Sequence, residues 1–131
     1  MRPTLQALVL ADQVYVDAAS GKKIIAGTFN ILRTGEFPTT FARSTFAYIN
    51  LTNIRQRTEL ELRYVDLEDN RVLMRSPRIE VQSPDPLQGV ELVVELPPFP
   101  MPHAGTYAFE AHADDELVGS LRITVAKRRQ P

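Results

Sequence analysis

Acidic residues gather at two predicted turns of this sequence, and carboxylate oxygens are the ligands that calcium prefers in proteins. Asp66 and Asp69 stand in one turn, and Asp114 and Asp115 stand in the other. Loops at one end of a β-sandwich can converge on calcium, as they do in C2 domains. Acidic residues are also ordinary turn formers, and their spacing here matches no calcium loop. The four aspartates therefore define a candidate ligand or calcium site at a loop end, with turn formation as the alternative.

Two histidines are the other side chains that could bind a metal. A zinc site needs three or four nitrogen, sulfur or carboxylate ligands, and the pair His103 and His112 does not supply such a set. We expect His112 to be exposed on the outward face of a strand and His103 to bond to backbone in a crossover. The sequence therefore predicts no bound metal and no cofactor.

No residue pattern typical of an enzyme is present. The nucleophile elbow Gly-x-Ser-x-Gly is missing, and the 6 glycines are too scattered to form a phosphate loop. The absence of cysteine excludes thiolate nucleophiles, thiolate zinc sites and disulfides. Because catalysis needs a base within reach of a nucleophile, we predict no catalytic residues and no enzymatic activity.

The charge of the chain is nearly balanced, with 15 basic and 16 acidic residues and a net charge of −1. Nucleic-acid binding usually requires a clear basic excess, and anionic membranes attract basic surfaces. We therefore predict neither a nucleic-acid nor a membrane partner. The apolar run Leu5–Ala11 follows Arg2 like a short signal peptide, but we interpret it as a strand. A chain without cysteine fits the reducing cytoplasm, which is the predicted location.

Apolar and polar residues alternate with a period of two through most of the chain, and no segment has a helical period. Leu60, Leu62 and Tyr64 face one way on one such segment, for example. Turn signals recur at short spacing, which is typical of a sandwich or a barrel. We predict an all-β fold, a two-sheet antiparallel β-sandwich of about 7 to 9 strands, immunoglobulin-like or C2-like. It forms one domain over residues 1–126, followed by a short basic tail at 127–131.

A proline-rich segment joins two of the predicted strands. Phe99 and Met101 alternate with prolines there, so the segment can hold apolar side chains rigidly over one end of the sandwich. The alternative is a polyproline ligand for an SH3-type partner. The next strand opens on Gly105-x-Tyr107, which resembles the tyrosine corner of immunoglobulin-like domains. The resemblance implies a structural role for Gly105 and Tyr107, although His103 stands where that corner has an acidic residue.

A second resemblance covers nearly the whole chain. Its residues are Leu10-Ala11-Asp12-Gln13-Val14, Asp17, Gly21-Lys22, Ile25-Ala26-Gly27-Thr28-Phe29, Leu96-Pro97-Pro98, Gly105-x-Tyr107 and Leu117-Val118-Gly119-Ser120. These segments resemble a family of small, uncharacterised bacterial β-sandwich domains. The resemblance implies a bacterial and cytoplasmic sandwich with no established activity.

The first predicted strand could lead to self-association. Its leucines Leu5, Leu8 and Leu10 leave it apolar on both faces and without charge. Such a strand at a sheet edge would need a partner, so we predict a protein partner or a homodimer through these residues. The predicted function is a non-catalytic binding or assembly module that acts through a sheet face or edge strand. The alternative is a loop-end domain that binds calcium or another ligand.

Overall fold

A computed structural model describes residues 2–129, and these residues form strands and turns without a helix. The twelve strands are β1 (Thr4–Val16), β2 (Lys23–Thr28), β3 (Ile31–Thr34), β4 (Thr39–Phe41), β5 (Phe46–Thr52), β6 (Thr58–Asp66), β7 (Arg71–Arg75), β8 (Ile79–Val81), β9 (Val90–Glu95), β10 (Phe99–Met101), β11 (Gly105–Ala113) and β12 (Glu116–Lys127). The prediction of an all-β chain is confirmed. Among the described residues, none lies in a helix long and apolar enough to cross a membrane.

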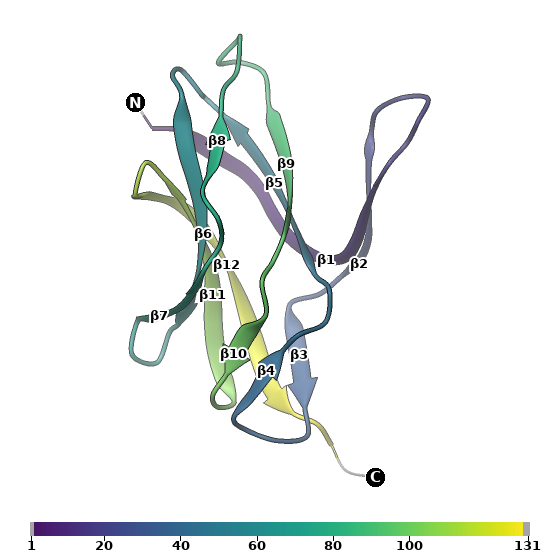
Figure 1. The fold of residues 1–131 in the computed structure, drawn as a ribbon, viewed down its shortest axis with the longest axis vertical. Coiled ribbons are helices and arrows are strands. Elements are labelled where there is room, and N and C mark those ends of the chain that lie inside the picture. The colour runs from purple at the N-terminus through teal and green to yellow at the C-terminus, as the bar shows by residue number, and fades with distance from the viewer. Residues whose placement is uncertain (1, 130–131) are drawn as a thin grey trace.

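The strands form three sheets, whereas two were predicted (Figure 1). One sheet has the order β2-β1-β5-β9, and the largest has the order β3-β12-β11-β6-β7 with β8 also paired to β6. The short strands β4 and β10 form a separate pair. The strand count exceeds the prediction partly because prolines, which cannot donate to a ladder, interrupt it and leave short strands. Pro77 separates β7 from β8, and the proline segment adds the short strand β10. One pair, β3 with β12, is parallel, whereas an antiparallel fold was predicted.

Both larger sheets contribute side chains to one core, whose centre is a group of aromatic rings. The Tyr64 ring stacks on Tyr107 with centroids 5.3 Å apart and lies 4.7 Å from the ring of Phe99. Phe109 completes the group, and all four side chains are at most 1% exposed. Each such buried side chain contributes about 1.5–3 kcal/mol of transfer free energy. The ring of Phe99 comes from the proline segment and so ties that segment to the two central strands of the largest sheet.

Strand β1 changes partner halfway along its length. Residues up to Ala11 pair with β5, and residues from Ala11 onward pair with β2. Gly27 lies at this change with a φ of 75°, and a Cβ there would overlap the Asp12 carboxylate. Only glycine tolerates both conditions. The β1–β2 hairpin therefore bends away from the rest of the fold, as Figure 1 shows on its right-hand side.

The strand predicted to carry a homodimer belongs to the core. Leu8 and Leu10 are buried at 8% and 0% exposure, and Leu5 packs against the same core beside Gly119. The backbone of this part of β1 is hydrogen-bonded to β5. These leucines are therefore not available to a partner, and the predicted homodimer through them is wrong.

Candidate metal-binding site

The four aspartates of the predicted loop-end site lie at opposite ends of the largest sheet. In the β6–β11 pair, Asp66 is in register with Tyr107, and Leu60 is in register with Ala113. The turn after β6 and the turn after β11 are therefore separated by most of the length of both strands (Figure 1). The structure thus brings Asp66 and Asp69 to one end and the other two aspartates to the far end.

Asp114 and Asp115 form the turn between β11 and β12. Their φ angles are 49° and 65°, which is the pattern of a two-residue type I′ hairpin turn. Asp114 Oδ1 accepts the Glu59 backbone N–H at 2.9 Å, and Asp115 Oδ1 accepts hydrogen bonds from Arg63 and Arg78. Both carboxylates therefore bond to neighbouring segments of the fold and do not point toward a shared ligand. This agrees with the alternative that the sequence left open, in which these aspartates form a turn.

The other end of β11 is built around Tyr107. Its hydroxyl donates to the carbonyl oxygen of His103 at 2.6 Å, and the His103 N–H lies 3.3 Å from the same hydroxyl oxygen. The two rings also stack, with centroids 5.4 Å apart. A Cβ on Gly105, whose φ is 156°, would lie 3.3 Å from the imidazole. This arrangement fixes the backbone and the ring plane of His103.

The imidazole of His103 is held between a backbone carbonyl and two carboxylates. Nδ1 lies 2.8 Å from the Ala104 carbonyl oxygen, and Nε2 lies 2.6 Å from Asp66 Oδ2 and 3.1 Å from Glu68 Oε2. The other oxygen of Asp66 accepts the Glu68 backbone N–H at 3.0 Å. One ligating atom from each of the three side chains lies within 4.8 Å of the others. We call Asp66, Glu68 and His103 the corner cluster.

The corner cluster combines a buried carboxylate with an accessible one. The Asp66 side chain is 2% exposed, whereas the Glu68 side chain is 74% exposed and that of His103 is 35% exposed. A hollow of about 420 Å³ opens beside Glu68 and His103 and extends to Thr106. A solute can therefore reach the cluster from the side of Glu68.

The charges of the corner cluster stabilise one another. The Ala104 carbonyl and Asp66 raise the pKa of His103, because both accept hydrogen bonds from the protonated ring. Burial pushes the pKa of Asp66 upward, but the Glu68 N–H and His103 outweigh it and the pKa lies below its usual value. The cluster therefore holds a positive charge between two negative ones, and that positive charge can be a proton or a metal ion.

Sequence reasoning found only one member of the corner cluster. It chose Asp66 as a ligand, noted Glu68 in the same acidic turn without choosing it, and set His103 aside for lack of further ligands. The available signals were the spacing of Asp66-x-Glu68 and the histidine four residues before a corner tyrosine. Asp69, the other predicted ligand in this turn, instead accepts the backbone N–H of Arg71 at 3.0 Å.

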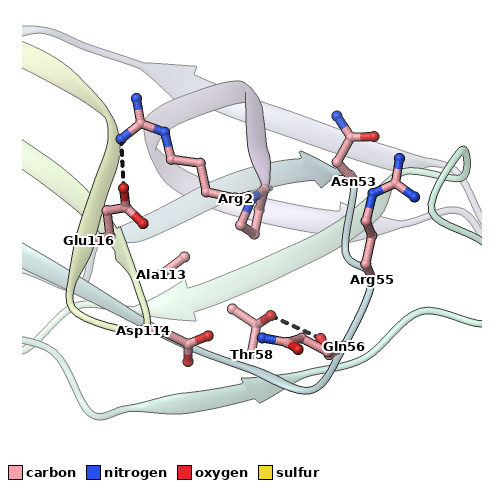
Figure 2. Close-up of a pocket in the computed structure, with 9 residues that line it drawn as sticks. Arg2, Asn53, Arg55, Gln56, Thr58, Ala113, Asp114 and Glu116 are labelled. Atoms are coloured by element: carbon pink, nitrogen blue, oxygen red, sulfur yellow. Dashed lines mark hydrogen bonds and ion pairs between the residues drawn. The ribbon is translucent and has the colours of Figure 1, made fainter.

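A second hollow, of about 480 Å³, lies at the far end of the molecule near the β11–β12 turn (Figure 2). Figure 2 shows Arg2 turned toward Glu116, to which it is bonded at 3.2 Å, while Arg55 points away beside Asn53. The two guanidinium groups do not converge on one point. The corner cluster is therefore the better candidate for a ligand site.

Comparison with solved structures finds a similar fold within a longer protein. Among 43 matching chains is the alkylpurine DNA glycosylase AlkC of Pseudomonas fluorescens, bound to DNA containing an abasic site analogue. The TM-score is 0.50 at 9% sequence identity, and the match covers 94% of this chain. This chain spans 30% of the length of the glycosylase, and at such low identity the likeness shows the fold alone.

This comparison overturns two predictions made from the sequence. The exclusion of enzymatic activity is overturned, because a similar fold forms part of a DNA glycosylase; the likeness assigns no activity to this chain. The exclusion of nucleic acid is overturned as well, because that glycosylase is bound to DNA; the likeness assigns no partner to this chain. Motif searches test only contiguous patterns, and net charge averages over the whole surface, so neither observation justified an exclusion. The predicted protein partner receives no support from the comparison.

Comparison at the level of sequence gives a family. No relative was found among the curated proteins. Residues 6–126, which include every strand from β2 to β11 and most of β1 and β12, match a family of unknown function. The predicted membership of a family of small β-rich domains without established activity is confirmed. The chain belongs to the family of unknown function DUF6941.

Proposed function

We propose that this protein is a small ligand-binding module of immunoglobulin-like β-sandwich architecture, and that its ligand is a divalent transition-metal cation. Zn²⁺ is the cation that the corner cluster fits best. The proposal develops the loop-end ligand site expected from the sequence. It keeps Asp66 and replaces the other three aspartates with Glu68 and His103.

The observation that carries the proposal is that two of the three ligands are already oriented by backbone groups. The Nδ1–H of His103 donates to the Ala104 carbonyl, so the Nε2 lone pair of the neutral ring points at the carboxylates. The Glu68 N–H holds Oδ1 of Asp66, which leaves Oδ2 toward the histidine. Histidines and carboxylates that bind metals are oriented by partners of this kind. These two ligands are therefore already ordered before a cation binds, so binding does not have to supply the entropic cost of ordering them.

The ligand types favour zinc over calcium. One imidazole nitrogen and two carboxylate oxygens suit Zn²⁺, whereas calcium takes six to eight oxygen ligands. In a tetrahedral zinc site two ligand atoms lie about 3.4 Å apart, given metal–ligand distances of about 2.1 Å. The separation between Nε2 of His103 and Oε2 of Glu68 is 3.1 Å, so little movement is required. The 2.6 Å contact with Asp66 must lengthen by less than about 1 Å once the proton leaves.

Three protein ligands leave the fourth position of a zinc ion open. Zinc sites of this kind bind water or a ligand oxygen at that position. The hollow beside Glu68 and Thr106 would give such a molecule access. A cytoplasmic location remains part of the proposal, and the absence of cysteine fits it. The bacterial origin in the proposal rests on the family resemblance of the sequence.

Titration calorimetry of the protein, first stripped with EDTA, tests the proposal. Zinc at about 100 times its dissociation constant should add about 2.7 kcal/mol of stability and raise the melting temperature by about 10 °C. Glu68→Gln should weaken zinc binding at least tenfold. Asp69→Asn is the matched control, because it removes an equal charge from the same turn and should leave zinc affinity unchanged. Equal losses in the two variants, or a calcium affinity equal to that for zinc, would refute the proposal.

A further inference from the structure

Five exposed basic side chains lie together on the neighbouring strands β3 and β12 and just beyond β12. They are Arg33, Arg122, Lys127, Arg128 and Arg129, and we call them the basic edge. None of the five forms a salt bridge with another residue of the described range 2–129. Most of the other arginines do, including Arg43 with Asp12 at 2.8 Å. The basic edge therefore carries charge that the fold itself does not neutralise.

The pairing of β3 with β12 places three of these charges, those of Arg33, Arg122 and Arg128, on one face. Ala126 is in register with Arg33, and the Arg128 N–H donates to the Thr34 carbonyl at 2.7 Å. Since Ile123 and Val125 point into the core, alternation places the even-numbered residues of β12 on the outer face. Arg122 and Arg128 thus mark the ends of a row about 20 Å long, with Arg33 beside it.

The net charge of the chain conceals this asymmetry. Elsewhere the chain has ten basic and sixteen acidic residues, a net charge of −6, against +5 on the basic edge. Glu36 is the acidic residue nearest to Arg33 in the sequence. Glu110 is the acidic residue nearest to Arg122 in the sheet, and it is bonded to His112 at 3.0 Å. The basic edge is therefore the part of the surface suited to an extended anion.

We propose that the basic edge binds the phosphate backbone of nucleic acid without preference for base sequence. This inference goes beyond the metal-binding function and does not depend on it. Guanidinium groups bind phosphate through paired hydrogen bonds, and DNA offers one charge per about 1.7 Å of its axis to a row of this length. The five side chains of the basic edge are all cationic, so their own contacts are with the phosphate backbone and not with stacked bases.

A membrane surface fits the basic edge less well than nucleic acid does. Stable binding to anionic lipid usually needs an apolar anchor beside the charges. Ile31 on β3 and Leu117 on β12 are the large exposed apolar side chains of the two strands, and Leu117 stands five residues before Arg122, so among the described residues of these strands Ile31 alone lies beside the charges. The phosphate-bearing partner is therefore inferred to be nucleic acid.

Fluorescence anisotropy with labelled 30-nucleotide DNA, single-stranded and duplex, tests this inference on the full chain. With four to five phosphate contacts, affinity should fall on the order of a hundredfold or more between 50 and 200 mM salt. EDTA is present throughout, so that failure of the metal site and failure of the basic edge can be told apart. Shuffling the DNA sequence should change affinity less than about twofold.

Two triple variants with equal charge changes make the test specific. Arg33→Gln/Arg122→Gln/Arg128→Gln should weaken DNA binding at least tenfold and reduce the salt slope by about 2.7. Arg2→Gln/Arg55→Gln/Arg57→Gln at the far end of the fold should change affinity by less than about threefold. The inference is overturned if both triples lose affinity equally, if no DNA binding is seen at 50 mM salt, or if only phosphatidylserine vesicles bind.

Discussion

The two histidines stand near opposite ends of β11 and differ in what surrounds them. His103 precedes the strand, and each of its ring nitrogens has a partner, with two carboxylates on Nε2. His112 lies within the strand, where Nε2 is 3.0 Å from Glu110, and Nδ1 is buried without a hydrogen-bond partner among the described residues. A histidine beside a single carboxylate therefore does not by itself form a metal site. A second carboxylate and access to solvent distinguish the corner cluster from the surroundings of His112.

The expected exposure of His112 was also wrong, and its neighbours explain why. The side chain is on the outward face but only 8% of the residue is exposed. Its register partner Glu61 is buried as well, under bonds from Arg63 and Arg75. Long charged side chains thus cover the middle of this sheet face. An outward position in the alternation therefore did not mean contact with water.

The largest expected effect is the difference in zinc affinity between variants of the two histidines. His103→Asn removes one of three ligands and should weaken zinc binding by at least about 100-fold. His112→Asn should leave the affinity within about twofold, because within residues 2–129 the Glu110 carboxylate is the one bonded to that ring. Titration calorimetry on both variants measures the difference. Similar losses for the two would mean that zinc binds at neither place specifically.

The next effect concerns the two stacked tyrosines beneath the cluster. Tyr107→Phe removes the hydrogen bond to the His103 carbonyl and should cost about 1 kcal/mol of stability and about tenfold in zinc affinity. Tyr64→Phe is the control, since the Tyr64 hydroxyl is buried without a partner among the described residues. Its loss should leave stability unchanged or higher. Urea unfolding measures both, and an equal cost for the two would show that the corner bond does not position His103.

The pH dependence of stability should report on His103 next. In the folded protein its pKa is raised from 6.5, so the stabilisation is complete below 6.5 and is lost as the pH rises through the raised value. The lowered pKa of Asp66 works in the other direction, since its stabilisation is present above 3.8 and is lost as the pH falls through the lowered value. In EDTA, the melting-temperature difference between wild type and His103→Asn should therefore shrink from pH 6 to pH 9.

Zinc affinity should follow the opposite trend over the same pH range. Zinc replaces the proton on His103, so binding should strengthen as the pH rises through the raised pKa of that ring. Calorimetry from pH 6 to pH 8 measures this change. An affinity independent of pH would show that zinc is not bound through the imidazole.

The smallest effect is expected at the turn near His112. Asp115→Asn weakens the pairing with Arg63 and Arg78, which are exposed or partly exposed contacts of small energy. The melting temperature should fall by less than about 3 °C and zinc affinity should not change. Thermal unfolding with and without zinc measures both. A loss of zinc affinity in this variant would restore the predicted site at the β11–β12 turn.

Residue types and their alternation are sufficient to explain the strands and their inward faces. Leu60, Leu62 and Tyr64 point into the core as expected, and so do Tyr107 and Phe109. The physical reason is local, because successive side chains of a strand point to opposite faces whatever its neighbours are. The pairing of β10 in the proline segment with β4 does not follow from alternation, because it depends on which distant strand the segment lies beside.

The candidate site and the basic edge depend on the assembled sheets. Asp66 and His103 are 37 residues apart in the chain and meet because β6 and β11 pair with Asp66 opposite Tyr107. Arg33 joins the basic residues of β12 through the one parallel pair of the largest sheet. Alternation carries no information about strand order or register, so it could not show which loops share an end. Nor can a net charge show where on the surface the charges gather.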